Sequence, residues 1–258
     1  MLNLQGKRAL VTGIANEFSI AWGIARQLHA AGCRLAIAYL PDDRDRTKTK
    51  VTELTQPLAP ELMLPLNVQD DGLIAAAFAE LEQQWGGLDV LVHCLAFAKK
   101  EELAGNFTDI SRDGYALAMD VSAYSLVPLC RYAKALMTTG GSVLALTYLG
   151  GARVIPNYNV MGSAKAALEM NVRYLAAELG PQHIRVNALS AGPIRTLASS
   201  AVSGIRDMIR HVEEVAPLRR SVTPVDVGNA AVFLASDLSA AVTGQVLYVD
   251  SGYEILGA

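Results

Sequence analysis

The chain has 258 residues, a hydrophobic content of 52% and a formal net charge of −3. That length fits one large α/β domain or two small ones, and the hydrophobic content is enough for a substantial core. The weakly acidic balance argues against a nucleic acid as partner. The sequence has no apolar run of ~18 residues, the length needed to cross a membrane, and no signal-peptide pattern at its N-terminus. We therefore expect a soluble, cytoplasmic protein with no membrane partner.

Three cysteines and four histidines are scattered along the chain. An odd number of cysteines at irregular spacing does not indicate a disulfide framework. None of the histidines stands at metal-ligand spacing from another histidine or from a cysteine. We therefore expect no metal site.

Seven short runs rich in Val, Leu, Ile and Ala predict buried parallel strands, at residues 7–12, 33–40, 62–66, 88–97, 141–148, 184–192 and 245–250. Segments with 3.6-residue apolar periodicity predict helices at residues 19–32, 71–86, 123–137, 157–180 and 223–236. This alternation predicts an α/β fold, a Rossmann-like doubly wound sheet of about seven parallel strands with helices on both faces. Residues 1–258 are expected to form a single domain, with ligands at the carboxyl ends of the strands.

The loop after the first strand, TGIANEFSIAWG at residues 12–23, lacks a strict G-x-G-x-x-G fingerprint. Gly13 nevertheless allows a tight turn, and Ser19 is expected to cap the next helix and offer its hydroxyl to a phosphate. These features predict dinucleotide binding here. The alternative is an ordinary strand–turn–helix connection.

After the second strand, Leu40 stands where an acidic residue would bind the adenosine ribose of NAD. Asp42 and Arg44 both follow closely, and an arginine would suit a 2′-phosphate, so these residues leave NADH and NADPH open. After the third strand, Asn67 and Val68 are placed to contact an adenine edge. The alternative for Asn67 is a simple turn residue.

The predicted helix over residues 157–180 carries Tyr158 near its start and Lys165 seven residues later. Seven helical residues rise ~10.5 Å and are offset by ~20° from two full turns, so both side chains share one face. Beside a nicotinamide, such a lysine binds the ribose hydroxyls and lowers the tyrosine pKa. The tyrosine hydroxyl donates to the substrate oxygen on which charge develops.

A Tyr-x3-Lys pair, the spacing found in ketone-reducing enzymes, is absent from the chain. In ketone reduction the carbon that accepts the hydride carries the oxygen itself. In a conjugated enoyl group the charge develops on an oxygen two carbons farther away, so the proton donor must stand farther from the nicotinamide. The wider spacing therefore predicts reduction of an enoyl thioester. The alternative is that both residues only pack or face solvent.

Several motifs resemble those of the short-chain dehydrogenase/reductase superfamily, and within it the bacterial NADH-dependent enoyl-(acyl-carrier-protein) reductases of type II fatty acid synthesis. They are GIANEFSIAWGIA in the first loop, LTYLGG, YNVMGSAK, SAGPIRTLA and, near the end, YVDSGY. The resemblance covers essentially the whole chain. It implies an oxidoreductase with NADH as cofactor, an enoyl thioester carried by acyl carrier protein as substrate, and a homotetramer.

The resemblance also implies residue roles. Tyr158, Tyr148 and Lys165 look catalytic, and Ala98, Tyr148 and Tyr158 look like substrate contacts. By position or by resemblance, the expected cofactor contacts are Gly13, Ser19, Ile20, Leu40, Asn67, Val68, Leu95, Lys165, Ile194, Arg195, Thr196, Leu197 and Ala198. Two of them depart from the family pattern, since a polar residue often stands at Leu40 and Asp is usual at Asn67.

Residues 192–216 are expected to form a lid over the substrate, because the first part of this segment is rich in small residues and buries little apolar area. An ordinary surface helix explains residues 205–215 equally well. Two other functions stay open. One is a ketoacyl or alcohol dehydrogenase of the same fold, and the other is a dinucleotide-binding regulator without catalytic activity.

Overall fold

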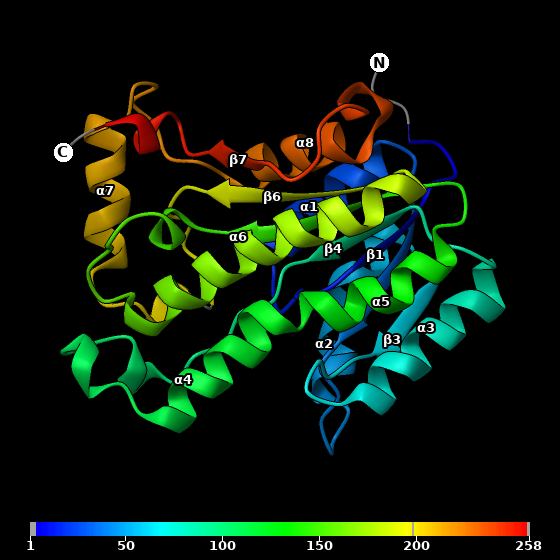
Figure 1. Ribbon diagram of the computed structural model, residues 1–258, viewed down its shortest axis with the longest axis horizontal. Coiled ribbons are helices and arrows are strands. Elements are labelled where there is room, and N and C mark those ends of the chain that lie inside the picture. The colour runs from blue at the N-terminus through cyan, green and yellow to red at the C-terminus, as the bar shows by residue number, and fades with distance from the viewer. Residues whose placement is uncertain (1–3, 198, 257–258) are drawn as a thin grey trace.

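A computed structural model describes residues 4–197 and 199–256 of the chain (Figure 1). Seven parallel strands form one sheet in the order β3-β2-β1-β4-β5-β6-β7. The strands are β1 (Arg8–Val11), β2 (Arg34–Tyr39), β3 (Leu62–Pro65), β4 (Val90–His93), β5 (Gly141–Thr147), β6 (Ile184–Ala191) and β7 (Val246–Val249). The predicted Rossmann-like, doubly wound fold is confirmed.

Eight α-helices of at least eight residues lie in the described part of the chain. They are α1 (Ile20–Ala30), α2 (Arg46–Thr55), α3 (Asp71–Trp85), α4 (Arg112–Met119), α5 (Leu126–Leu136), α6 (Asn159–Leu179), α7 (Ile205–Val215) and α8 (Pro224–Ala235). A π-helical segment, Asp120–Tyr124, joins α4 to α5. The five helices predicted from apolar periodicity correspond to α1, α3, α5, α6 and α8.

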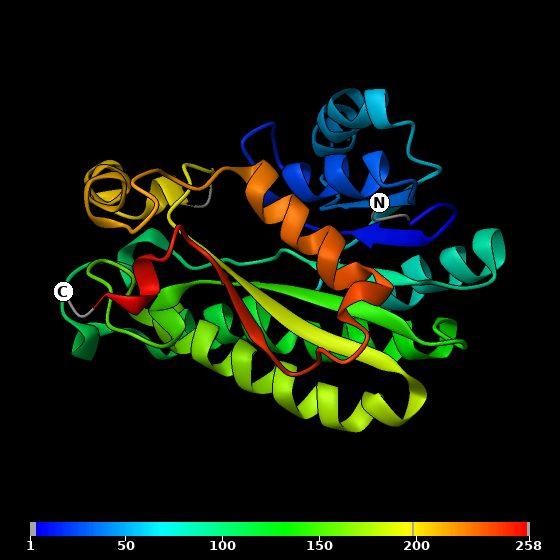
Figure 2. The same cartoon turned by 90° about the horizontal axis from the view of Figure 1, so that it is seen from above.

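The sheet is covered on both faces, which is why its strands are almost uniformly apolar. One core cluster joins the sheet to α1, α2 and α8, and contains Ile24, Val51 and Val227. The other joins the opposite face to α3, α5 and α6, and contains Phe78 and Leu168. Figure 2 shows the two helical layers on either side of the strands, with α8 in orange and α1 in blue on the upper side. Burial of both faces stabilises the continuous Val, Leu and Ile runs that predicted the strands.

Helices α2 and α4 were not predicted. Helix α2 is mostly polar: it reads RTKTKVTELT, with Val51 and Thr55 as its buried residues. Helix α4 has only eight residues and buries Gly114 and Ala118. A weak apolar stripe of this kind gives little periodic signal in the sequence.

The strand order reverses between β1 and β4: β2 and β3 are added on one side of β1, and β4 to β7 on the other. Strands β1 and β4 are therefore neighbours although two strands separate them in sequence. Here the predicted strand over residues 88–97 ends early, at His93. Its continuation bonds to side chains instead: Cys94 N donates to Thr12 Oγ1 at 3.2 Å, and Phe97 N donates to Ser122 Oγ at 3.0 Å. The segments that follow β1 and β4 therefore stay close together at the carboxyl edge, where a doubly wound sheet binds its ligands.

Gly13 is required by this close approach of β1 and β4. Its φ is +87°, and a Cβ at this position would lie 2.0 Å from the carbonyl oxygen of Cys94. Only glycine avoids both the steric clash and the unfavourable backbone conformation. The predicted tight turn after the first strand is present.

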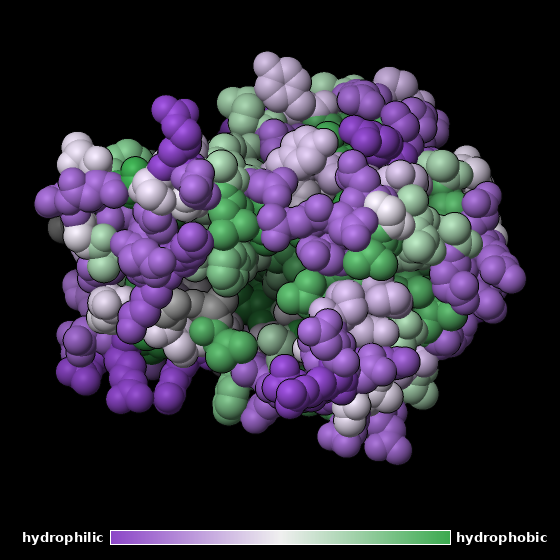
Figure 3. All heavy atoms as spheres, turned by 90° about the horizontal axis from the view of Figure 1, so that it is seen from below, coloured by the Kyte–Doolittle hydropathy of each residue, from purple (hydrophilic) through white to green (hydrophobic). Residues whose placement is uncertain are grey.

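Seen from below, the molecular surface is hollowed near its centre, and hydrophobic residues line the base of the hollow (Figure 3). Among the described residues, no helix is both long and apolar enough to cross a bilayer.

Candidate functional site

Two tyrosines and a lysine lie near the end of β5 and the start of α6. The rings of Tyr148 and Tyr158 pack edge to face, with centroids 5.0 Å apart and planes at 70°. The turn between them approaches α6 so closely that a Cβ on Gly150 would lie 2.4 Å from the Tyr158 ring, and one on Gly162 would lie 2.9 Å from the Gly150 carbonyl oxygen. The glycines of LTYLGG and YNVMGSAK thus allow the two tyrosines to meet.

Tyr158 precedes the first residue of α6 as its N-cap. It stands between Asn157, with φ +61°, and Asn159, with φ +22°. Asparagine tolerates this region of backbone space better than most residues. Asn157 Nδ2 donates to Ser203 O at 3.1 Å, and Asn159 Nδ2 donates to Gly105 O at 3.2 Å. The two asparagines therefore fix Tyr158 between the segment before α7 and the loop after β4.

Burial raises the pKa of both phenols. For Tyr158, burial is the larger cause and Tyr148 the smaller one. For Tyr148, burial comes first and Tyr253 second. Tyr158 is therefore a protonated hydrogen-bond donor at neutral pH. The expectation that Lys165 lowers the tyrosine pKa is wrong, because burial dominates and two helical turns separate the pair.

Lys165 is buried, with 5% of its surface exposed. Its Nζ donates to the carbonyl oxygen of Leu146 at 2.6 Å. Burial lowers its pKa to about 8, and the nearby Cys94 and Glu169 oppose that change. A lysine has three N–H donors, so two remain for groups other than Leu146. The ribose hydroxyls of a nicotinamide nucleotide are suitable acceptors.

The N-terminus of α1 lies in the first loop, and its capping differs from the prediction. Ser19 is the N-cap, but its hydroxyl makes no capping bond to the helix. Instead the hydroxyl accepts the backbone N–H bonds of Ala15 and Asn16, at 3.1 Å each, and so folds the loop back on itself. The first helical turn, which begins at Ile20, contains no acidic residue. This helix end therefore suits a phosphate through its backbone N–H groups.

Beyond β2, Leu40 is 58% exposed. Asp42 accepts backbone N–H bonds from Thr47 at 2.7 Å, Arg44 at 3.0 Å and Arg46 at 3.3 Å. These bonds, that of Thr47 first, hold the pKa of Asp42 well below its usual range. The carboxylate therefore closes the turn before α2, and the apolar side chain of Leu40 stands at the strand end.

Beyond β3, the side chain of Asn67 also closes a turn. Its Oδ1 accepts the backbone N–H of Gln69 at 3.1 Å. Val68 is partly buried and packs against the core on the α3 side. Asn67 thus has the geometry of the turn residue that the sequence left as an alternative, and Val68 presents an apolar surface beside it.

The remaining predicted contacts lie at the ends of β4 and β6. Leu95 packs against the core, and Ala98 packs in a small cluster with Tyr158 and Met161. After β6, Ile194 is buried, whereas Arg195 and Leu197 are exposed. A hydroxyl pair shapes this turn: Thr196 N donates to Ser199 Oγ at 2.8 Å, and Ser199 N donates to Thr196 Oγ1 at 3.0 Å. The predicted contact Ala198 lies outside the described residues.

Sequence reasoning missed the π-helical segment and the polar groups around it. His93 is fully buried at the end of β4, with Nε2 2.7 Å from Ser125 Oγ. Ser125 Oγ donates to Val121 O at 2.7 Å, so His93 Nε2 donates to Ser125. Burial, helped by Lys165, lowers the pKa of His93 to about 3, and the ring is neutral. Asn171 Nδ2 bonds the Ala123 carbonyl at 3.0 Å. Since these partners come from other elements, the sequence alone gave no signal.

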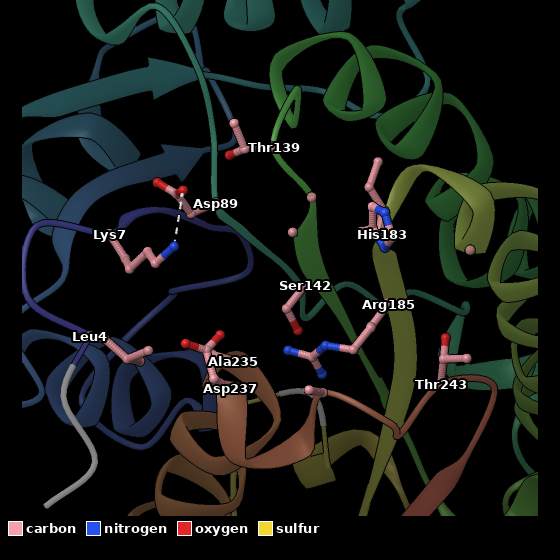
Figure 4. A pocket seen from close by; sticks show the side chains of 15 residues that line it. Leu4, Lys7, Asp89, Thr139, Ser142, His183, Arg185, Ala235, Asp237 and Thr243 are labelled. Carbon is pink, nitrogen blue, oxygen red and sulfur yellow. Dashed lines mark ion pairs between the residues drawn. The ribbon is translucent and has the colours of Figure 1, made fainter.

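A cavity of about 380 Å³ opens at the opposite, amino edge of the sheet (Figure 4). Three of its charged side chains already have partners: Lys7 Nζ lies 3.7 Å from Asp89 Oδ1, and Arg185 Nη1 donates to Ser239 Oγ at 2.8 Å. Tyr158 and Lys165 do not line it. The buried polar groups at the carboxyl edge, rather than this cavity, locate the chemistry. Among the described residues, no cluster of His, Cys, Asp and Glu is arranged to hold a metal ion.

Residues 13–254 match the family model described as Enoyl-(Acyl carrier protein) reductase. The chain belongs to this family. The NADH-dependent enoyl-(acyl-carrier-protein) reductase FabI of Synechocystis sp. is 65% identical to it over 100% of both chains. FabI of Escherichia coli is 47% identical, over 98% of this chain and 95% of its own length.

Solved structures of the enoyl-(acyl-carrier-protein) reductase family have the same fold. The Bacillus cereus enoyl-acyl carrier protein reductase with NADP+ and indole naphthyridinone matches with a TM-score of 0.96 at 51% identity, over 100% of both chains. The Anaplasma phagocytophilum enzyme in complex with NAD matches with a TM-score of 0.95 at 44% identity, over 100% of this chain and 97% of its own.

The buried ammonium of Lys165 is expected to lower the stability of this reductase-family chain at neutral pH. Because the folded-state pKa is below that of an unfolded lysine, this cost is largest below about pH 8 and disappears as the pH rises toward 10.5. Lys165→Met should therefore raise the free energy of unfolding at pH 7, by up to about 3 kcal/mol. Urea unfolding at pH 7 and pH 10 measures it.

The matched control is Lys134→Met, because Lys134 is partly exposed and pairs with Glu178 on the surface. Its stability should change little at either pH. Equal effects of the two substitutions at pH 7, or stabilisation by Lys165→Met that persists unchanged to pH 10, would contradict the prediction.

Proposed function

We propose that this family member is an NADH-dependent enoyl-(acyl-carrier-protein) reductase, which converts a trans-2-enoyl thioester to the saturated acyl thioester in fatty acid elongation. One observation carries the proposal. Tyr158 and Lys165 stand seven residues apart at the carboxyl edge of the sheet, near the β1–β4 crossover, with Lys165 buried and Tyr158 partly buried. The names of the relatives, at up to 65% identity over the full chain, agree with this activity.

The residues present fit a nicotinamide dinucleotide. The first turn of α1 is free of acidic residues and can receive the pyrophosphate. Lys165 offers donors to the nicotinamide ribose. Beyond β2, the carboxylate of Asp42 is bonded to the backbone of its own turn, so the exposed apolar side chain of Leu40 stands at the strand end. We propose NADH as the cofactor. Exposed Arg44 keeps NADPH as the second candidate, and the Bacillus cereus structure was solved with NADP+.

NADH, when bound, supplies the hydride that adds to the β-carbon of the enoyl group. The chain's own contribution is to hold the charge that then develops on the thioester oxygen. Tyr158 does this by donating its phenolic proton in a hydrogen bond, since burial keeps the phenol protonated. Lys165 holds the ribose two helical turns away, so the donor stands beyond the hydride-accepting carbon. The α-carbon then takes a proton.

The surroundings of Tyr158 are suited to an acyl chain. Ala98, Met161 and Val202 belong to the same apolar cluster as the Tyr158 ring. The ring of Tyr148 packs edge to face with that of Tyr158. The Tyr148 hydroxyl lies 2.9 Å from Met208 Sδ on α7. A thioester oxygen at Tyr158 would therefore have hydrocarbon and sulfur around the adjoining carbons. Exclusion of water there strengthens the hydrogen bond to the enolate.

Crotonyl-CoA should be reduced with oxidation of NADH, and acetoacetyl-CoA should not. Tyr158→Phe should lower kcat about 100- to 1000-fold, because it removes a donor to the developing oxyanion. Its affinity for NADH should stay within about twofold of the wild type, since Lys165 still holds the ribose. The decrease in NADH absorbance and NADH fluorescence measure the two quantities.

Tyr174→Phe is the matched control, because Tyr174 is on the same helix but is 72% exposed. Oxidation of NADH with the ketone alone would favour a dehydrogenase of the same fold. Binding of NADH with no turnover of either thioester would favour a regulator.

We propose that residues 192–216 act as a lid over this site. Helix α7 buries only Val212 among its described residues, so few apolar contacts hold it down. Two hydrogen bonds join this segment to the site: Tyr148 bonds to Met208, and Asn157, the residue before Tyr158, bonds to Ser203. Such a segment opens at low cost and closes when ligand adds contacts.

Protease cleavage within residues 199–204 should slow by at least about fivefold when NAD+ and an acyl ligand are bound together, because closure protects the backbone. Cleavage products identified by mass spectrometry locate the protected bonds, and cleavage elsewhere in the chain serves as control. An unchanged rate within this segment at saturating ligand would rule out the lid.

We propose a homotetramer, supported by apolar residues exposed on one helical layer. Tyr115 of α4, Tyr124 of the π-helical segment, and Met170 and Tyr174 of α6 are 41–72% exposed. A group of exposed apolar side chains commonly marks a protein interface. Sedimentation should give four times the 27.5 kDa chain mass, and Met170→Glu with Tyr174→Glu should lower it. A wild-type monomer would refute the proposal.

A further inference from the structure

Glu169 is a buried carboxylate on α6 that the proposed reaction does not use. It is 6% exposed and lies one helical turn after Lys165, on the same face. Its Oε1 accepts a hydrogen bond from Thr147 Oγ1 at 2.8 Å. Burying a carboxylate is costly unless it is paired or bonded. Its position beside a buried ammonium therefore suggests a role beyond packing.

Glu169 and Lys165 both bond to the end of β5. Lys165 Nζ bonds to Leu146 O at 2.6 Å, and Glu169 Oε1 bonds to the hydroxyl of the next residue, Thr147. The residue after that is Tyr148, whose ring packs on Tyr158. Leu146 and Thr147 at the end of β5 thus contact Lys165 and Glu169 of α6, and Tyr148, the next residue, contacts Tyr158 at the N-cap of α6. The two hydrogen bonds fix how far α6 is displaced along β5.

Gly151, in the turn that follows β5, packs against α6 beside Glu169 and Lys165. A Cβ at this position would lie 2.8 Å from Glu169 Oε1 and 3.0 Å from the backbone carbon of Lys165. The turn therefore packs directly against the carboxylate and against the backbone that carries the ammonium. A displaced Glu169 side chain would meet this turn, so the carboxylate is held in one place.

Other titratable groups around the pair are neutral at physiological pH. At the end of β4, His93 has a pKa of about 3, and the thiol of Cys94, the next residue, has a pKa of about 12, both because of burial. From β7, Tyr248 faces Glu169, and its pKa is raised, chiefly by burial. At the N-cap of α6, Tyr158 is protonated. Cys94 and Glu169 both oppose the effect of burial on the pKa of Lys165, and since the Cys94 thiol is neutral at physiological pH, Glu169 is the charged group of the two.

We propose that Glu169 is a positioning residue for nicotinamide nucleotide binding: it keeps Lys165 charged inside the closed site and fixes its ammonium relative to the end of β5. This inference rests on the proposed role of Lys165 as the ribose-binding residue. The carboxylate acts in two separable ways, through its charge on Lys165 and through its hydrogen bond with Thr147.

Glu169→Gln tests the charge, because the amide keeps an oxygen acceptor for Thr147 but is neutral. Without the negative charge, Lys165 should lose its proton at a lower pH. The dissociation constant for NADH, followed by NADH fluorescence, should therefore rise about five- to tenfold at pH 8.5 and less than about twofold at pH 6.5. The alkaline limb of the binding profile should move to lower pH.

Thr147→Val tests the hydrogen bond, because it removes the hydroxyl and leaves the charge. It should weaken NADH binding by a similar factor at both pH values, and Thr147→Ser should restore it. Glu178→Gln is the matched control for charge, since Glu178 lies on the same helix but is exposed and pairs with Lys134. Its profile should match that of the wild type.

A purely structural Glu169 would give a different result. Glu169→Gln would then lower thermal stability and weaken NADH binding equally at both pH values, or leave binding unchanged, and either outcome overturns the proposal. An equal shift in Glu178→Gln overturns it as well. Because NADH binding is measured without an enoyl substrate, a wild type that fails to reduce crotonyl-CoA refutes the proposed reaction and leaves this test in place.

Discussion

The arrangement of the site depends on a buried charge, the ammonium of Lys165. Taking an ammonium out of water is costly, so its hydrogen bonds and nearby charges must be fixed by the fold. The carbonyl of Leu146 and the carboxylate of Glu169 provide them, and both require α6 to lie very close to the end of β5. That approach is possible because Gly150 and Gly151 have no side chains. The position of Tyr158 follows from the same contact.

The sheet and five helices could be predicted because their residues carry the signal themselves. Strands buried on both faces read as continuous apolar runs, and α1, α3, α5, α6 and α8 bury regular apolar stripes. Polar α2 and short α4 carry almost none. The π-helical segment depends on Asn171, which binds the carbonyl of Ala123 from another helix. A partner 48 residues away leaves no local pattern.

The site was predicted in the same uneven way. The sequence predicted Tyr158 and Lys165 on one face of a helix over residues 157–180, whereas in the structure Tyr158 is the N-cap that precedes α6. The protonation states of these two side chains could not be predicted from the sequence, since they depend on burial that only the fold determines. The asparagines on either side of Tyr158 were a missed signal, because this residue type often adopts positive φ. Ser19 shows the opposite error: a common capping residue whose hydroxyl bonds backward into its own loop.

The position of Tyr158 at the N-cap of α6 has an electrostatic consequence. The aligned peptide dipoles of this 21-residue helix place roughly half a positive elementary charge at that end. An enolate oxygen bonded to Tyr158 would lie in this field, which favours negative charge. The field falls off within the first turn, and Lys165 lies in the second turn of α6. The helix end therefore acts on the substrate oxygen at Tyr158 and leaves the charge of Lys165 to its own neighbours.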